Sequence, residues 1–386
     1  MRAITVGSLV QDIIVIVADA AIEQMRMSNA TSSFLLLEAG KKVDTTTILE
    51  TCGGGAANAA VALARLGFDA AILGKIGTDS AAAFLKPKLE AEGVDLSRVT
   101  ALDDAPTGRS VIIIAHDRDP AILVNRGANT RLACEEVEDA SFAGVDLVCV
   151  TPLSGQSADC YGALVARAKS AGAYVLAIPG IRQLSSRGEE FLASLPQVDT
   201  VIVNRREASQ LVALVARGLD AGRHRLEAAD ASSGPMPRLL AGGLEHGGFA
   251  LTFADFAAAI LARGARTLVI TDGSQGAVAV EGESVVHAPI VEAEIVATVG
   301  AGDAFATTFA AMQVEGGSLE RALGAAAVNA ASVIGALDTQ SNLLRREALE
   351  RGVAALSPER TRSWRLVDQD RGSRRARPPR RAKARP

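Results

Sequence analysis

Short apolar runs alternate with alanine-rich stretches along most of the chain. Each run has the length of a buried strand, and the stretches between the runs have the length and composition of helices. The runs lie at Ala3–Val6, Ala70–Leu73, Val111–Ala115, Asp146–Val150, Tyr174–Ile178, Thr200–Val203 and Thr267–Thr271. Strands that alternate with helices usually pair in parallel and are covered on both faces. The pattern therefore predicts an α/β fold of three layers around a mostly parallel central sheet.

The chain is longer than one such core needs. Its 386 residues, of which 48% are hydrophobic, exceed the roughly 250–300 residues at which single cores stop growing. We assign residues 1–356 to one domain with a surface insertion at 213–258, which is rich in Gly, Arg, Asp and Ser. Residues 357–386 hold eleven Lys or Arg and three acids and are expected to form a basic, disordered tail. Because these charges are not regularly interleaved with aromatic residues, a nucleic-acid partner is not expected.

A first candidate site lies in the segment Thr298–Phe305, where Gly300, Ala301 and Gly302 precede Asp303 and an apolar helical run that reaches about Met312. Free amides at a helix start attract anions, and glycine lets a phosphate approach the backbone. A carboxylate beside such a cradle can take the proton of a hydroxyl during phosphoryl transfer. The alternative is a plain glycine turn capped by an aspartate.

A second candidate site is the glycine cluster Cys52–Ala60, which leads into the small-residue helix Val61–Gly67. Gly53 and Gly54 predict close approach of another group. Asn58 falls in the first helical turn, where its amide can bind hydroxyls of a polyol. The alternative is tight packing of this helix on a sheet, which also favours Gly and Ala.

Together the two segments resemble the signature stretches of the ribokinase-like (PfkB) carbohydrate kinases. Further segments that are similar to family motifs follow in the same order: Val6–Ser8 with Asp12, Gly74–Asp79, Arg126–Asn129, Asn204–Glu207 and Thr271–Gly276. The resemblance covers roughly residues 3 to 350. It implies the ribokinase-like fold with a small β-lid, and residues 13–51 contain three β-prone pieces that could supply it: Ile13–Val17, Phe34–Leu37 and Thr45–Leu49.

The resemblance also implies roles for individual residues. Asp303 would be the general base, and the amides of Gly300, Ala301 and Gly302 the anion hole. Asp12, Gly53, Gly54 and Asn58 would bind the acceptor. Asn204, Glu207, Thr271, Gly273 and Gly276 would bind ATP, with Glu207 reaching Mg²⁺ through water. From the residues alone, Asn204 also suits a strand-end turn and Glu207 a carboxylate favoured at a helix start.

These roles imply ATP-dependent phosphorylation of a hydroxymethyl group on a small sugar or sugar-like alcohol. A nucleoside kinase of the same family is the alternative, although an aromatic content of 3% favours a sugar. A second alternative is a catalytically silent ligand-binding sensor, which would have no need of Asp303.

Two departures from the family pattern bear on cofactors. Ala297 occupies the position of the usual aspartate before Thr298, so K⁺ activation is in doubt. Ile178–Gly180 also lacks the aspartate that many relatives carry at this strand end. The four cysteines have no CxxC spacing, and no apolar run reaches about 18 residues. We therefore expect a cytoplasmic protein without a membrane span, and the resemblance allows a homodimer formed through the lid.

Overall fold

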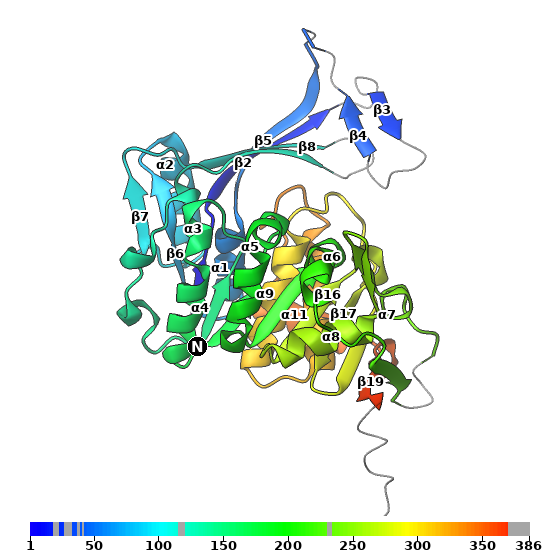
Figure 1. The fold of residues 1–386 in the computed structure, drawn as a ribbon. Coiled ribbons are helices and arrows are strands. Elements are labelled where there is room, and N and C mark those ends of the chain that lie inside the picture. Colours follow the sequence, from blue (N-terminus) through cyan, green and yellow to red (C-terminus); the bar gives the residue numbers. More distant parts are fainter. Residues whose placement is uncertain are drawn as a thin grey trace, which may run out of the picture.

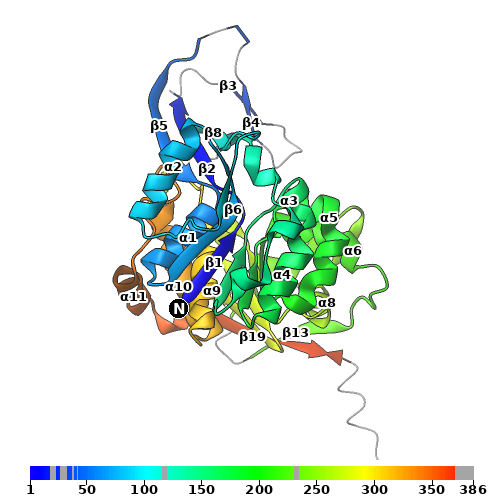
Figure 2. The same cartoon turned by 90° about the vertical axis from the view of Figure 1, so that its left-hand side faces the viewer.

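The fold consists of a large body and a smaller β-sheet that projects from one end of it (Figure 1). The computed structural model describes residues 1–17, 23–26, 33–36, 39–40, 42–114, 120–229 and 234–369. Figure 2 shows helices on both sides of the sheet of the body. The α/β class with a mostly parallel central sheet is thereby confirmed.

The middle layer of the body is an 11-stranded sheet in the described part of the chain. In spatial order its strands are β13 (His224–Ala228), β19 (Arg362–Asp368), β18 (Ser284–Ala288), β17 (Ala277–Glu281), β16 (Thr267–Thr271), β12 (Thr200–Asn204), β11 (Tyr174–Ala177), β10 (Leu147–Val150), β1 (Arg2–Val6), β6 (Asp69–Gly77) and β7 (Val99–Leu102). Neighbours from β16 to β7 pair in parallel, whereas those from β13 to β16 pair antiparallel. The parallel strands from β16 to β6 are buried on both faces, which explains their continuous apolar sequences.

Helices cover the two faces of this sheet. One layer contains α1 (Gly55–Arg65), α2 (Ser80–Ala91), α9 (Ala301–Val314), α10 (Leu319–Val333) and α11 (Arg346–Ala354). The other contains α3 (Gln156–Asp159), α4 (Tyr161–Ser170), α5 (Ile181–Ser194), α6 (Arg205–Val215), α7 (Arg238–Gly242) and α8 (Phe253–Ala262). Among the helices described, none combines the length and the apolar character that crossing a membrane requires.

The projecting sheet is a lid with the strand order β5 (Thr45–Gly53), β2 (Val10–Val17), β8 (Gly108–Ile114) and β9 (Ala121–Asn125). Two predicted lid pieces, Ile13–Val17 and Thr45–Leu49, lie in β2 and β5. The third falls on β4 (Ser33–Leu36), which pairs with β3 (Glu23–Arg26) in a separate sheet, and its residue 37 lies outside the described residues.

The run Val111–Ala115 was expected in the central sheet, but the structure places residues 111–114 in the lid as part of β8 (Gly108–Ile114), and residue 115 lies outside the described residues. Ile112 and Ile114 of this strand are buried with Ile14 of β2 against Ala297 of the body. The residues between them face the other side of the lid and are also apolar. β8 therefore packs on the body with one face only, yet its sequence does not alternate between apolar and polar residues. The sequence could not distinguish such a strand from a central one.

The predicted boundary of the basic tail at residue 357 is wrong. Arg362–Asp368 forms β19, which pairs with β18 and β13 inside the main sheet. Trp364 and Leu366 point into the core and are 3% and 7% exposed. The exposed Arg365 stands between these two buried residues and Arg362 begins the strand, so the sequence of the strand resembles the basic residues that follow it. Residues 370–386 of the predicted tail lie outside the described residues.

The predicted surface insertion 213–258 also needs correction at its ends. Val215 belongs to α6, and Phe253 and Phe256 of α8 are completely buried under the sheet. Between them, α7 and the hairpin of β14 (Leu244–His246) and β15 (Phe249–Leu251) bury Leu239 and Leu244 in the same core. Both ends of the segment and the elements α7, β14 and β15 are therefore packed on the body rather than appended to it.

Candidate active site

The two predicted glycine segments meet at the carboxyl ends of the parallel strands. Each begins a helix, α1 and α9, and the two helices pack against each other. Asn58 in the first turn of α1 donates a hydrogen bond from Nδ2 to Oδ2 of Asp303 in the first turn of α9, at 2.8 Å. The residues stand 245 positions apart in the chain, so this contact is created only by folding.

The glycines of the first segment are required by the groups that approach them. A Cβ atom on Gly53 would lie 1.8 Å from Oδ2 of Asp12. Gly54 has a φ of +97°, and a Cβ there would lie 2.5 Å from the carbonyl oxygen of Ser8. The predicted close approach is therefore made by Asp12 and by the backbone of the Val6–Ser8 segment. The carboxylate of Asp12 therefore lies in contact with Gly53, just before the start of α1.

Asp12 and Asp303 form a pair of acidic groups with unusual pKa values. Burial raises the pKa of Asp303 to about 6, and the hydrogen bond from Asn58 opposes this rise. Burial also raises the pKa of Asp12 to about 6, where the hydrogen bond from Ser110 lowers it and the charge of Asp303 raises it again. Two carboxyl groups with raised pKa values beside a glycine loop have the properties of a proton-transfer site.

A polar loop behind α10 fixes the orientation of the Asn58 amide. Its Oδ1 accepts hydrogen bonds from Thr339 Oγ1 at 2.8 Å and from Gln340 Nε2 at 3.0 Å. Since both donors hold the oxygen, Nδ2 is the end of the amide that is turned toward Asp303. Thr339 and Gln340 could not be predicted from the sequence, because no local pattern indicates which helix start a loop will contact.

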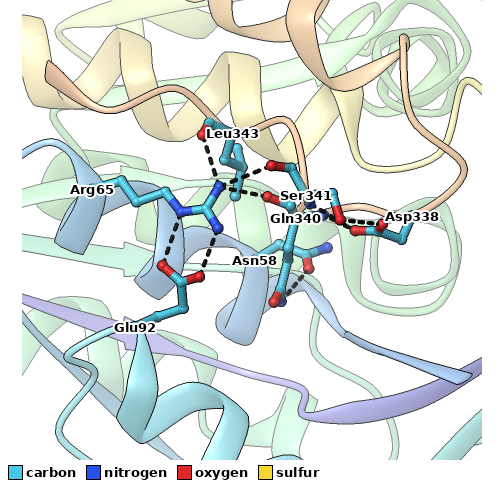
Figure 3. A network of polar contacts seen from close by, with 7 residues as sticks. All are labelled: Asn58, Arg65, Glu92, Asp338, Gln340, Ser341 and Leu343. Atoms are coloured by element: carbon cyan, nitrogen blue, oxygen red, sulfur yellow. Dashed lines mark hydrogen bonds and ion pairs between the residues drawn. The ribbon is translucent and has the colours of Figure 1, made fainter. Parts of the chain in front are cut away.

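Arg65 ties this loop to the rest of the molecule (Figure 3). Its Nη1 donates to the carbonyl oxygens of Gln340 and Leu343 at 2.7 and 2.8 Å, while Nε and Nη2 hold both carboxylate oxygens of Glu92 at 2.9 and 2.6 Å. Asp338 folds the loop on itself through the backbone amides of Gln340 and Ser341. Arg65 thereby supports the donors that orient Asn58.

A cavity of about 630 Å³ lies on the other side of the α9 start. It contains the predicted nucleotide residues Thr271, Gly273 and Gly276 and the predicted anion-hole residues Ala301 and Gly302. Its remaining lining is mostly apolar and comes from Ser274, Ala277, Ala288–Ala293, Ile295, Thr298, Phe305, Ala327, Ala330, Ala331 and Ile334. A Cβ atom on Gly302 would meet nothing within 4 Å, so the backbone there is open to a ligand. Gly300 has a φ of +82° and starts α9.

Asn204 and Glu207 make a reciprocal cap at the start of α6. Asn204 Oδ1 accepts from the amide of Glu207, and Glu207 Oε2 accepts from the amide of Asn204, both at 2.9 Å. Burial raises the pKa of Glu207, and the charge of Asp303 adds to this rise. Neither residue is among the described residues that line the 630 Å³ cavity. The two residues thus form the strand-end turn and the helix-start carboxylate that the sequence also allowed. The charge of Asp303 nevertheless affects the pKa of Glu207.

Two further motif segments hold the frame of the site. Asp79 caps α2 by accepting from the amide of Ala82 at 3.1 Å. Asn129 grips the backbone of Leu9 through its amide oxygen and nitrogen, at 3.0 and 2.8 Å. The contacts of Asn129 fix the chain that leads from β1 into the lid strand with Asp12.

Both the sequence and the fold of the chain are similar to those of known kinases. The model of the pfkB family carbohydrate kinases matches residues 14–228 and 250–346. The chain is 30% identical over 309 residues to the ATP-dependent ribose-1-phosphate kinase of Halopiger xanaduensis, which covers 80% of this chain and 87% of that protein. Among solved structures, it resembles a ribokinase from Cryptococcus neoformans in complex with ADP and the adenosine kinase of Sinorhizobium meliloti. The TM-scores are 0.63 and 0.66 at 22% and 23% identity, and each match covers 91% of this chain and 99% and 98% of the respective relative.

The chain belongs to the pfkB family of carbohydrate kinases. It is a phosphotransferase that acts on an alcohol group, and a sugar or nucleoside kinase in the broad sense. The match leaves residues 229–249 unaligned, a shorter segment than the insertion predicted from the sequence.

Proposed function

We propose that this protein transfers the γ-phosphate of ATP to a hydroxymethyl group of a small sugar or sugar-like alcohol. The observation that supports this best is the position of Asp303. Its carboxylate faces Asn58 and Asp12 on one side, while the backbone of Ala301 and Gly302 faces the large cavity on the other. An acceptor on the first side and a nucleotide in the cavity would meet at the start of α9.

The residues supply the chemistry that such a transfer needs. Asn58 engages Oδ2 of Asp303, which leaves Oδ1 to accept the proton of the attacking hydroxyl. With a pKa of about 6, the carboxyl group is mostly ionised at neutral pH and still basic enough to act. The amides of Gly300, Ala301 and Gly302 at the helix start favour the negative charge that develops on the transferring phosphoryl group.

Mg²⁺ fits the acidic groups on the nucleotide side. The charge of Asp303 raises the pKa of Glu207 beyond the effect of burial, so a cation near the two carboxyl groups would relieve their repulsion. Glu207 uses only Oε2 for its helix cap, and carboxylate oxygen is a donor that Mg²⁺ prefers, often through water. When bound, the ion would neutralise the nucleotide phosphates.

K⁺ is not part of the proposal. The side chain of Ala297 is completely buried and packs with Ile14, Ile112 and Ile114 of the lid. An apolar contact thus replaces the carboxylate that the family resemblance places at this position.

The leading test is the Asp303→Asn variant. The amide keeps the size of the side chain but cannot accept the proton, so we expect a loss of about 10²- to 10⁴-fold in turnover. ATP affinity, measured by calorimetry, should stay close to wild type. Phosphorylation by the variant at the wild-type rate would show that Asp303 is not the base.

The acceptor class is tested by kinetics with ribose, deoxyribose and adenosine. The similarity to the ribose-1-phosphate kinase and the few aromatic residues support a sugar acceptor. A much higher kcat/KM for adenosine would instead establish the nucleoside alternative. An absence of transfer to any alcohol would favour the silent sensor, against which the intact Asp303 argues.

We also propose that the lid forms a homodimer contact. Large apolar side chains are exposed on it at Ile48, Ile122 and Leu123, with 64%, 51% and 63% of their surface accessible. Apolar surface of this kind is usual where another chain binds. Light scattering of the wild type should give twice the monomer mass. The double variant Ile48→Ser and Leu123→Ser should give the monomer mass. A monomeric wild type would refute the contact.

We further propose that the protein acts in the cytoplasm, which cell fractionation would test.

A further inference from the structure

Two irregular segments of the chain form one side of the 630 Å³ cavity. The first is Gly273–Gly276, the turn between β16 and β17, which contains the short 3₁₀ helix η6 (Gly273–Gln275). The second is residues 289–295 after β18, which form neither a helix nor a strand. Both contribute to the lining of the cavity. Since an irregular segment has no ladder of hydrogen bonds of its own, its position depends on contacts from other parts of the chain.

The two segments touch each other through the backbone. Gly276 has a φ of +86°, and a Cβ atom on it would lie 2.1 Å from the carbonyl oxygen of Ala288 and 2.8 Å from Cα of Pro289. No side chain fits between them, so this contact sets their distance. A displacement of Pro289 would therefore change the shape of the cavity.

Arg360 holds the second segment from outside the cavity. Its Nη2 donates to the carbonyl oxygen of Pro289 at 2.6 Å and to that of Ile290 at 2.9 Å. Hydrogen bonds from a charged donor are stronger than those between neutral groups. The side chain of Ile290 is 45% exposed, so burial alone holds this segment weakly. Arg360 itself is half-buried and is not among the described residues that line the cavity.

The strand β19 brings Arg360 to this position. β19 begins at Arg362 and pairs antiparallel with β18, where Arg362 stands opposite His287. The same register, continued by two residues, places Arg360 level with Pro289. The match to the kinase family ends at residue 346. Arg360 therefore belongs to a part of the chain that the family model does not describe.

His287 holds the first segment in a similar way. Its Nε2 lies 2.8 Å from the carbonyl oxygen of Gln275. A carbonyl oxygen can only accept, so Nε2 carries the proton and donates it. The His287 residue is only 9% exposed and is not among the described residues that line the cavity. His287 and Arg360 thus contact the two segments from behind, while the front of each segment faces the cavity.

We propose that Arg360 and His287 are positioning residues for the nucleotide, which hold the two segments at the spacing that an adenine nucleotide needs. The inference rests on the proposed function only in that the cavity binds ATP. Neither side chain touches the ligand. A cavity that is held in its binding shape is competent for a larger fraction of the time, and the apparent Kd falls in proportion. The chain beyond the last kinase motif therefore contributes to ATP binding.

The test is direct binding of nucleotides. Calorimetry with AMP, ADP and a non-hydrolysable ATP analogue, in the presence of Mg²⁺, is carried out on wild type, Arg360→Met, Arg360→Lys, His287→Leu and His287→Gln. Arg365→Met is the matched control, because Arg365 lies on the same strand and forms an exposed pair with Glu283. Thermal unfolding without nucleotide checks that each variant is folded, and the half-buried Arg360 carries the test if His287→Leu does not fold.

We expect Arg360→Met to raise the Kd of all three nucleotides by one common factor of about 5- to 50-fold. The factor is common because the segment that moves lines the cavity and Arg360 touches no phosphate. Arg360→Lys keeps a charged donor and should lose less. His287→Leu should raise the Kd by about 3- to 10-fold, and His287→Gln, whose amide can donate to the same carbonyl, by less. Arg365→Met should bind as wild type does.

Kinetics give a second readout, with whichever of ribose, deoxyribose and adenosine the wild type phosphorylates fastest. In Arg360→Met the KM for ATP should rise with the Kd, while kcat at saturating ATP should stay within about threefold of wild type. The reason is that Asp303 and the start of α9 are unchanged in this variant. A fall in kcat with an unchanged KM for ATP would contradict a positioning role.

Three binding results would overturn the inference. The first is an unchanged Kd in folded Arg360→Met. The second is an equal loss in Arg365→Met, which would indicate a general effect of the altered strand. The third is a loss that grows from AMP to the ATP analogue, which would show that Arg360 contacts phosphate directly. A wild type that binds no nucleotide would refute the proposed function as well, whereas the three results above refute the inference alone.

Discussion

Replacement of Asp303 by Asn is expected to stabilise the fold at neutral pH while it removes activity. Burial raises the pKa of Asp303 from its ordinary value of 3.8 to about 6, and the hydrogen bond from Asn58 offsets only part of this effect. The ionised group is therefore less stable in the fold than in the unfolded chain. The difference between the two pKa values sets an upper limit of about 3 kcal/mol. Because solvent reaches part of the residue, we expect about 1–2 kcal/mol.

The sign of this effect depends on pH. Since the pKa of the folded state lies above that of the unfolded state, the protonated carboxyl group favours the fold. That contribution is fully present below pH 3.8 and is lost as the pH rises through about 6. An Asn side chain does not ionise, and its oxygen can still accept the hydrogen bond from Asn58. The gain of the variant over wild type should therefore grow as the pH rises from about 4 to about 6 and stay constant at higher pH.

Urea unfolding of wild type and Asp303→Asn at about pH 4.5 and pH 7.5 measures the difference in the free energy of unfolding. Asp79→Asn is a control of opposite sign. Burial acts to raise the pKa of Asp79, but hydrogen bonds from Thr107 and Ala82 outweigh it and lower that pKa. This control should lose stability at pH 7.5. The reasoning is refuted if Asp303→Asn is no more stable than wild type at pH 7.5, or if its gain is the same at both pH values.

Three further predictions concern the site and the chain end. Removal of the Asn58 donor in Asn58→Ala should raise the pKa of Asp303, so the acidic limb of the kcat profile should move to higher pH; an unmoved limb would contradict the contact. Exchange of K⁺ for a bulky organic cation should change kcat, measured as the rate of ADP release, by less than about tenfold, because Ala297 offers no carboxylate; a larger loss would reveal another cation site. Truncation after residue 369 should leave Tm and kcat unchanged, whereas truncation after residue 356 removes the buried Trp364 and Leu366 and should cost several kcal/mol, roughly 1.5–3 for each side chain. Equal Tm values for the two truncations would refute the role of β19.

The sequence was sufficient for features that depend on neighbouring residues. The alternation of apolar runs and alanine-rich stretches indicated the α/β class because buried parallel strands and their helices leave a continuous local pattern. The positions of Gly300, Gly302 and Asp303 at a helix start could likewise be predicted, since glycine and a first-turn carboxylate are local signals. Gly53 and Gly54 indicated a close approach, although not the group that makes it.

Only the tertiary structure decided which of these local features meet. The contact of Asn58 with Asp303, and its orientation by Thr339 and Gln340, join segments more than 240 residues apart. The same holds for β8, which pairs within the lid, and for β19, in which Trp364 and Leu366 are buried on either side of Arg365. Local sequence sets the conformation of a segment, but its partners are set by the burial of surface from the whole chain, which no short pattern contains.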